Sequence, residues 1–363
     1  MNVNHILQVR DGEVARTFQN FLAAWWSRLE LDALLAPVEL PGHAGVSAQV
    51  ITDPADLCNV NPFAPVMLSN SATQVEPFVR AHPGAHLAVV LRPCELRALV
   101  ELWKRHRVHF QPPAASRDGH GDLTIIGVDC PGTFAPAEYI EHVTEHREDA
   151  EMISINLAYG RQESYIPRQV RESCRLCDTP APLGADIVIG TIGIAPQGYM
   201  LVISRDEGLD SALKLQDVTD GLASEQQVVC REQMVGKLVE ERQEKRSETI
   251  HKQAQGGEEF DLPFALFARC TLCADCLDAC PLYDGELSGM LGVSDGRRSA
   301  NLLLSELVNL SRWLASCSGC GMCQEACEHG VLLTPLVTGL SHRIQRQLHY
   351  KPGDPAQPLP WTV

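Results

Sequence analysis

Eight of the fourteen cysteines in this 363-residue chain stand in two copies of one spacing near the C-terminus. The copies are CTLCADCLDAC and CSGCGMCQEAC, 47 positions apart, and both read C-x2-C-x2-C-x3-C. In this pattern three thiolates hold one iron–sulfur cubane, and the fourth cysteine ligates the neighbouring cluster. Two zinc sites fit less well, because zinc usually takes two C-x2-C pairs set apart by a longer loop. We therefore assign two [4Fe–4S] clusters, one to Cys270, Cys273, Cys276 and Cys327, the other to Cys280, Cys317, Cys320 and Cys323.

Four cysteines of the N-terminal half adjoin apolar segments. Cys94 follows HLAVVLRP, Cys130 follows LTIIGVD, and the pair Cys174 and Cys177 precedes ADIVIG. Because the carboxyl ends of parallel strands meet at one edge of a sheet, we expect these thiols to converge there. Four thiolates fit a third [4Fe–4S] cluster or a zinc ion. The residues alone leave separate, unrelated thiols as a further alternative.

Apolar patterning predicts the elements that would place these thiols. Residues 14–34 have helical periodicity, and 86–91 and 123–128 are apolar runs typical of buried strands, with a helix starting near residue 94. Residues 64–72 suggest a strand, a polar loop and a helix start, and 185–203 suggest two strands around a turn. Strands that alternate with helices favour an α/β domain with a largely parallel sheet over residues 1–223.

The second half of the chain has a different character. Ser224 with Gln227 forms a capping box, and the charged stretch that follows predicts a linker helix over 224–258, with a hinge at 255–261. Residues 259–345 contain both cysteine repeats and are expected to form a mainly α-helical ferredoxin-type domain. Residues 346–363 are rich in proline and predict an extended tail.

Other classes of protein are not supported. A net charge of −16 without a basic stripe argues against nucleic acid as a partner. Neither a G-x-G-x-x-G nor a phosphate-binding loop occurs. With no secretory signal and no long apolar segment, so many cysteines predict a cytoplasmic protein that does not span a membrane. Cys58 and Cys230 lack a metal-binding context and are expected to be ordinary buried or partly buried thiols.

The segments LAVVLRPCELRAL, IIGVDCPGT and CRLCDTPAPLGADIVIG resemble the beta-subunit family of coenzyme F420-reducing hydrogenases and dehydrogenases, over about residues 15–220. The variant with LRPCELRALVEL and a C-terminal ferredoxin module is similar to formate-dehydrogenase-type beta subunits. The C-terminal part resembles the helical ferredoxin modules of succinate dehydrogenase and heterodisulfide reductase. The resemblance implies a third [4Fe–4S] cluster, held by Cys94, Cys130, Cys174 and Cys177.

The family resemblance also implies a flavin, FAD, but this chain departs from the family pattern. No glycine follows Gly12 in the region where the family has a Gly-Gly stretch, and Asn61 stands where a lysine is expected. These departures leave flavin binding open. The polar residues expected near the same crevice are Asn70, Ser71, Arg92 and Thr133. The alternative role for each is turn capping and loop hydrogen bonding.

Three functions follow. The first is an electron-relay subunit of a cytoplasmic redox complex, with a formate dehydrogenase, hydrogenase or heterodisulfide-reductase-like partner carrying the catalytic site. The second is a flavoenzyme that itself oxidises or reduces a nicotinamide or deazaflavin coenzyme. The third is a redox-sensing iron–sulfur protein. The relay is favoured, because a cluster normally moves one electron and two-electron catalysis would need the flavin.

Overall fold

The computed structural model describes residues 2–43, 45–110, 123–144, 170–194, 198–255, 268–283 and 300–362. Residues 111–122, which precede the strand predicted over 123–128, lie outside this part of the chain. Most of the predicted hinge at 255–261 also lies outside it. Among the described residues, no helix combines the length and apolar character needed to cross a membrane.

A seven-stranded sheet forms the centre of the N-terminal domain, in the order β1-β7-β6-β5-β4-β2-β3. The four central strands β2, β4, β5 and β6 are parallel, and the outer strands β1, β3 and β7 pair antiparallel with their neighbours. The predicted α/β class with a largely parallel sheet is therefore confirmed. The strands are β1 Val3–Gln8, β2 Ala33–Glu39, β3 Val46–Ile51, β4 Leu87–Leu91, β5 Leu123–Val128, β6 Ile187–Gly190 and β7 Tyr199–Ser204.

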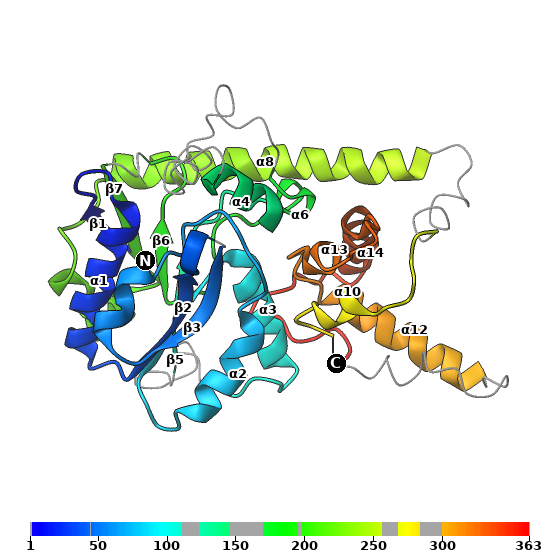
Figure 1. Cartoon of the computed structure of the whole chain (residues 1–363), viewed down its shortest axis with the longest axis horizontal. Coiled ribbons are helices and arrows are strands. Elements are labelled where there is room, and N and C mark those ends of the chain that lie inside the picture. The colour runs from blue at the N-terminus through cyan, green and yellow to red at the C-terminus, as the bar shows by residue number, and fades with distance from the viewer. Residues whose placement is uncertain are drawn as a thin grey trace.

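Helices cover both faces of this sheet because side chains alternate along each strand. Val90 and Ile126 lie in one core with helix α1 (Val14–Leu29), while Val89 and Ile125 lie in the other with α2 (Ala72–Ala81) and α3 (Pro93–Lys104). Figure 1 shows the sheet between these helices. Shorter elements complete the domain: η1 Pro41–His43, η2 Pro54–Asn59, α4 Pro136–Thr144, α6 Glu172–Arg175, α7 Glu207–Ala212 and η4 Leu215–Asp217.

Two predictions of secondary structure were wrong. Helix α1 ends at Leu29, where Glu30 adopts a left-handed conformation, so residues 33 and 34 belong to β2 rather than to a helix reaching residue 34. The strand predicted in the segment 64–72 did not form, because Val66 makes only an isolated bridge with Phe134. Apolar periodicity does not distinguish the end of a buried helix from the start of a buried strand.

Helix α8 (Glu225–Gln255) matches the predicted linker helix in position and in its capping box, where the amide of Ser224 donates to Gln227 at 2.8 Å. It runs along the α/β domain toward the helical C-terminal part (Figure 1). Arg231 anchors it to the buried carboxylate of Asp129, which directly precedes Cys130. The helix is therefore held against the α/β domain by a buried ion pair.

The C-terminal part is mainly helical, as predicted. Its helices are α10 Asp275–Asp278, α12 Ala300–Ala315, α13 Met322–Glu325 and α14 Leu333–Gln347. Leu282, just after the first cysteine repeat, is buried in the same core as α2 and α3. The helical part therefore docks on the α3 side of the sheet (Figure 1).

Asp186, one residue before β6, gives the fold a testable pH dependence. It accepts the amide of Ile125 at 2.9 Å, and burial raises its pKa from 3.8 to about 6. The folded state thus holds this proton more tightly than the unfolded chain, so the associated stability is present below about pH 4 and is lost as pH rises to about 6. We expect the melting temperature of Asp186→Asn to rise relative to that of the wild type between about pH 5 and about pH 7. A difference that does not change with pH would contradict this assignment.

Candidate metal centres

The four predicted N-terminal cysteines line one small cavity. Cys94 lies in the first turn of α3 after β4, Cys130 follows β5, and Cys174 and Cys177 come from α6 and the turn after it. The ends of β4 and β5 and the turn at α6 thus bring together thiols that are up to 83 positions apart in the sequence. One further cysteine, Cys320 of the second C-terminal repeat, lines the same cavity.

Burial and mutual repulsion dominate the electrostatics of this cavity. Burial raises the pKa of Cys94 well above its usual value, and Glu95, Cys130 and Cys320 act in the same direction. Burial also raises the pKa of Cys130, with a contribution from Cys174. Such thiols stay protonated until a cationic group neutralises them, so metal binding here would release protons.

Cys177 differs because cations surround it. Burial alone would raise its pKa, but Arg97 and Arg242 outweigh that effect, and the net pKa is lowered. The Nη2 of Arg97 lies 3.6 Å from the Cys177 sulfur and donates to the carbonyl of Ser318 at 2.6 Å. Arg97 therefore connects the N-terminal cavity to the second C-terminal cysteine loop.

Arg171 provides a second buried cation beside the sulfurs. Its Nε donates to the hydroxyl of Thr133 at 2.8 Å, and that hydroxyl lies 3.4 Å from the sulfur of Cys174. Sequence reasoning did not identify Arg97 or Arg171. Arg97 could have been found from its position three residues after Cys94, since residues so spaced share a helix face.

The second cavity is lined by four cysteines, which we call the middle group: Cys280, Cys317, Cys320 and Cys323. This is the set expected from crossed ligation. The indole nitrogen of Trp313 donates to the sulfur of Cys280 at 3.2 Å. Burial, followed by the charge of Cys320, raises the pKa of Cys280 to about 12. A cysteine of the first repeat is thus placed among three cysteines of the second.

The remaining cysteines of the two C-terminal repeats form the outer group. Burial raises the pKa of Cys276, with further contributions from Cys273, Cys327 and Cys270, so these four thiols lie near one another. Cys270 and Cys273 are exposed. This group is therefore the one of the three that opens most to solvent within the described part of the chain.

The two cysteine loops share one backbone conformation. Leu272 and Ala274 have positive φ values of 60° and 72°, and Gly319 and Gly321, 47 positions later, have 68° and 75°. Helices α10 and α13 follow at the same offset. A Cβ on Gly321 would lie 2.3 Å from the hydroxyl of Ser173, so glycine is required where the α/β domain packs on the second loop.

The N-terminal cavity and the cavity of the middle group, which we call the two inner cavities, have a common wall. Ser173, Gly319 and Cys320 line both of them. Cys323 of the middle group is in turn influenced by Cys276 of the outer group, which acts with burial to raise its pKa. The three cysteine groups therefore follow one another in space, from the N-terminal cavity to the exposed loop.

Comparison with known proteins finds matches for both halves of the chain. Residues 84–229 match the family model for the C terminus of the coenzyme F420 hydrogenase/dehydrogenase beta subunit, and residues 267–331 match a 4Fe-4S dicluster domain. Residues 84–229 therefore match this beta-subunit family, and residues 267–331 match the dicluster domains. The dicluster match covers both C-terminal cysteine repeats.

The chain is also similar to two formate dehydrogenase beta subunits. An F420-dependent formate dehydrogenase subunit beta from Methanocaldococcus jannaschii is 23% identical over 300 residues, covering 74% of this chain and 73% of the relative. An F420-dependent formate dehydrogenase 1 subunit beta from Methanococcus maripaludis is 22% identical over 223 residues, 54% of each chain. A chain of the F420-reducing [NiFe] hydrogenase complex from Methanosarcina barkeri aligns with a TM-score of 0.49 at 12% identity, covering 71% of this chain and 94% of that one.

The residues predicted to lie near a flavin make hydrogen bonds within the protein. Ser71 donates through its amide and its hydroxyl to the buried carboxylate of Glu95, and Arg92 donates to the carbonyls of Pro62 and Ala64. Asn70 accepts the amide at residue 72, but its Nδ2 has no partner among the described residues. The flavin assignment stays a prediction.

Three further residues complete the comparison with the sequence-based predictions. Thr133, the fourth flavin candidate, lies beside Cys174. Cys58 and Cys230 are exposed rather than buried, contrary to prediction. Apolar context in a sequence does not reveal which face of a helix a thiol occupies, as Cys230 on α8 shows.

Proposed function

We propose that this chain is an iron–sulfur electron-transfer subunit of a cytoplasmic redox complex, with three [4Fe–4S] clusters bound by the twelve grouped cysteines. The observation that supports this most is the common wall of the two inner cysteine cavities. When bound, [4Fe–4S] clusters exchange single electrons with neighbouring redox centres. The partner would be the catalytic subunit of a formate dehydrogenase, hydrogenase or heterodisulfide-reductase-like complex.

The residues at the N-terminal cavity fit a cluster better than a single zinc ion. Among the described residues, no three Cys, His, Asp or Glu side chains are gathered closely enough to hold one metal ion. The four sulfurs instead surround a cavity, as a cubane requires. Arg97, Arg171 and Arg242 lie beside them and would offset the negative charge of a thiolate-bound cluster.

The chain's own side chains would set the properties of the relay. Arg97 joins the two inner loops, Ser173 fills the space between them, and Trp313 donates to a cysteine sulfur of the middle group. Hydrogen bonds to ligand sulfurs and local charge are the means by which a protein adjusts cluster potentials. We further propose the division into 1–223, a linker helix 224–258, a ferredoxin domain 259–345 and a tail 346–363.

Iron, zinc and flavin analysis of the anaerobically purified protein tests the proposal. We expect about twelve iron atoms per chain, four for each of three clusters, and no zinc. About eight iron atoms with one zinc would show that the N-terminal domain is a zinc-stabilised scaffold. About eight without zinc would leave Cys94 and its neighbours as free thiols. Bound flavin would favour the alternative that the chain is itself a flavoenzyme acting on a nicotinamide or deazaflavin coenzyme.

A further inference from the structure

A groove of about 780 Å³ lies where helix α14 meets helix α8 and the residues that follow α6. Cys177 and Cys317 both line it. Cys177 also lines the N-terminal cysteine cavity, and Cys317 lines the middle one. The groove thus opens the protein surface onto both inner cysteine groups at once.

The rim of this groove is positively charged, although the chain has a net charge of −16. Arg346, His349 and Lys351 are exposed and line it. The acidic residue in the lining, Asp178, is already paired with Arg246 at 2.6 Å. Within the described residues, neither Arg346 nor Lys351 forms an ion pair.

The position of the charges decides what kind of anion fits. At the floor, the guanidinium of Arg97 is already engaged with the Ser318 carbonyl and the Cys177 sulfur. The free cations lie on the exposed rim, where they can contact an acidic protein surface that covers the opening. A small anion resting on the floor would find no free cation there among the described residues.

We propose that this groove is the docking site of an acidic one-electron carrier protein. The inference rests on the proposed relay function and deepens it by placing one electron entry or exit point. One electron would leave the reduced carrier and be taken up by the chain, or pass in the opposite direction, with no bond made and no proton transferred. Complementary charge steers such encounters and raises their association rate.

Stopped-flow kinetics with the holoprotein and a two-electron-reduced acidic flavodoxin test this, with oxidation to the semiquinone as the signal. We expect the double variant Arg346→Glu/Lys351→Glu to lower the second-order rate at low salt by at least about tenfold. The difference should shrink at high salt, because screening removes the attraction. The matched control is Arg343→Glu on the same helix, which is exposed and does not line the groove; its rate should change less than about twofold.

Reduction by dithionite, followed by electron paramagnetic resonance, separates the two proposals. Two outcomes would show that the docking site is wrong while the relay stands, provided that dithionite reduces all variants normally. In the first, the double variant and the Arg343→Glu control react with flavodoxin at the same rate. In the second, the wild type does not react with flavodoxin. If dithionite yields fewer than three reducible clusters in the wild type, the relay itself is wrong. If the double variant loses only its reaction with anthraquinone disulfonate, a small anionic mediator, the groove is a small-molecule site and the docking proposal is overturned.

Discussion

Replacing Cys94 with alanine is expected to lower the iron content of the anaerobically purified protein from about twelve to about eight atoms per chain. Cys94 lies with Cys130, Cys174 and Cys177 around one cavity, and no other N-terminal cysteine lines it in the described structure. Losing one of four thiolate ligands would remove the proposed cluster, while a small, half-buried side chain is replaced by a slightly smaller one. The fold should therefore survive the change.

The measurement for Cys94→Ala is iron per chain with electron paramagnetic resonance of the reduced protein, which should lose one of three cluster signals. Cys230→Ala is the matched control, because Cys230 is exposed and lies outside all three groups. The control should keep about twelve iron atoms. An unchanged iron content in Cys94→Ala would show that the N-terminal thiols do not hold a cluster.

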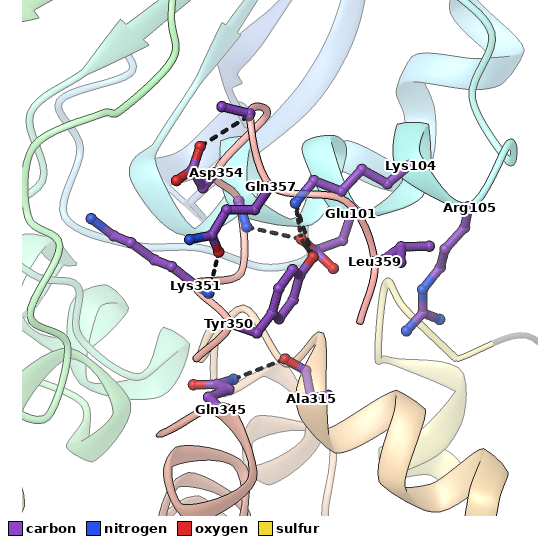
Figure 2. Close-up of polar contacts among 12 residues, drawn as sticks. Glu101, Lys104, Arg105, Ala315, Gln345, Tyr350, Lys351, Asp354, Gln357 and Leu359 are labelled. Atoms are coloured by element: carbon purple, nitrogen blue, oxygen red, sulfur yellow. Dashed lines mark hydrogen bonds and ion pairs between the residues drawn. The ribbon is translucent and has the colours of Figure 1, made fainter. Parts of the chain in front are cut away.

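Replacing Glu101 with alanine is expected to destabilise the protein by about 3–5 kcal/mol, because it leaves the buried ammonium of Lys104 without its charge partner. The fully buried carboxylate of Glu101 accepts Tyr350 at 2.6 Å, the amide of Gly353 at 2.9 Å and Lys104 at 3.1 Å. Figure 2 shows Glu101, Lys104 and Tyr350 converging between α3 and the C-terminal tail. Burial and the Glu101 carboxylate raise the pKa of Tyr350, which therefore remains a protonated donor.

We expect Glu101→Ala also to release the C-terminal tail from α3. Gly353 packs so closely on Arg97 that a Cβ there would lie 2.4 Å from its side chain, so the tail also supports the arginine that joins the inner cysteine loops. Limited proteolysis with mass spectrometry should show faster cleavage after residue 347 in Glu101→Ala. Glu244→Ala, at an exposed position on α8, is the control. Equal melting temperatures and equal cleavage rates for the two variants would contradict the role of Glu101.

Much of the architecture could be predicted because it depends on local rules. Continuous apolar runs predicted the strands that precede Cys94 and Cys130, and the capping box at Ser224 predicted the start of α8. The boundary between α1 and β2 could not be predicted, because Ala33 and Leu34 are apolar in either element and only their pairing with β4 and β3 makes them a strand. The Cys230 prediction failed for a similar reason, since exposure depends on which helix face the rest of the molecule covers.

The sequence by itself determined where the thiols stand: eight lie in two repeats with a spacing typical of iron–sulfur ligands, and four follow strands or form a C-x2-C pair, which predicted that they meet. That information is local, since thiolate spacing and strand ends define which side chains can meet. Only the tertiary structure decided that Cys320 lies beside both inner cavities, that Arg97 and Ser173 stand between them, and that a basic groove leads to Cys177 and Cys317. These contacts join segments more than 100 positions apart, and they arise from the docking of one domain on another, which no local pattern encodes.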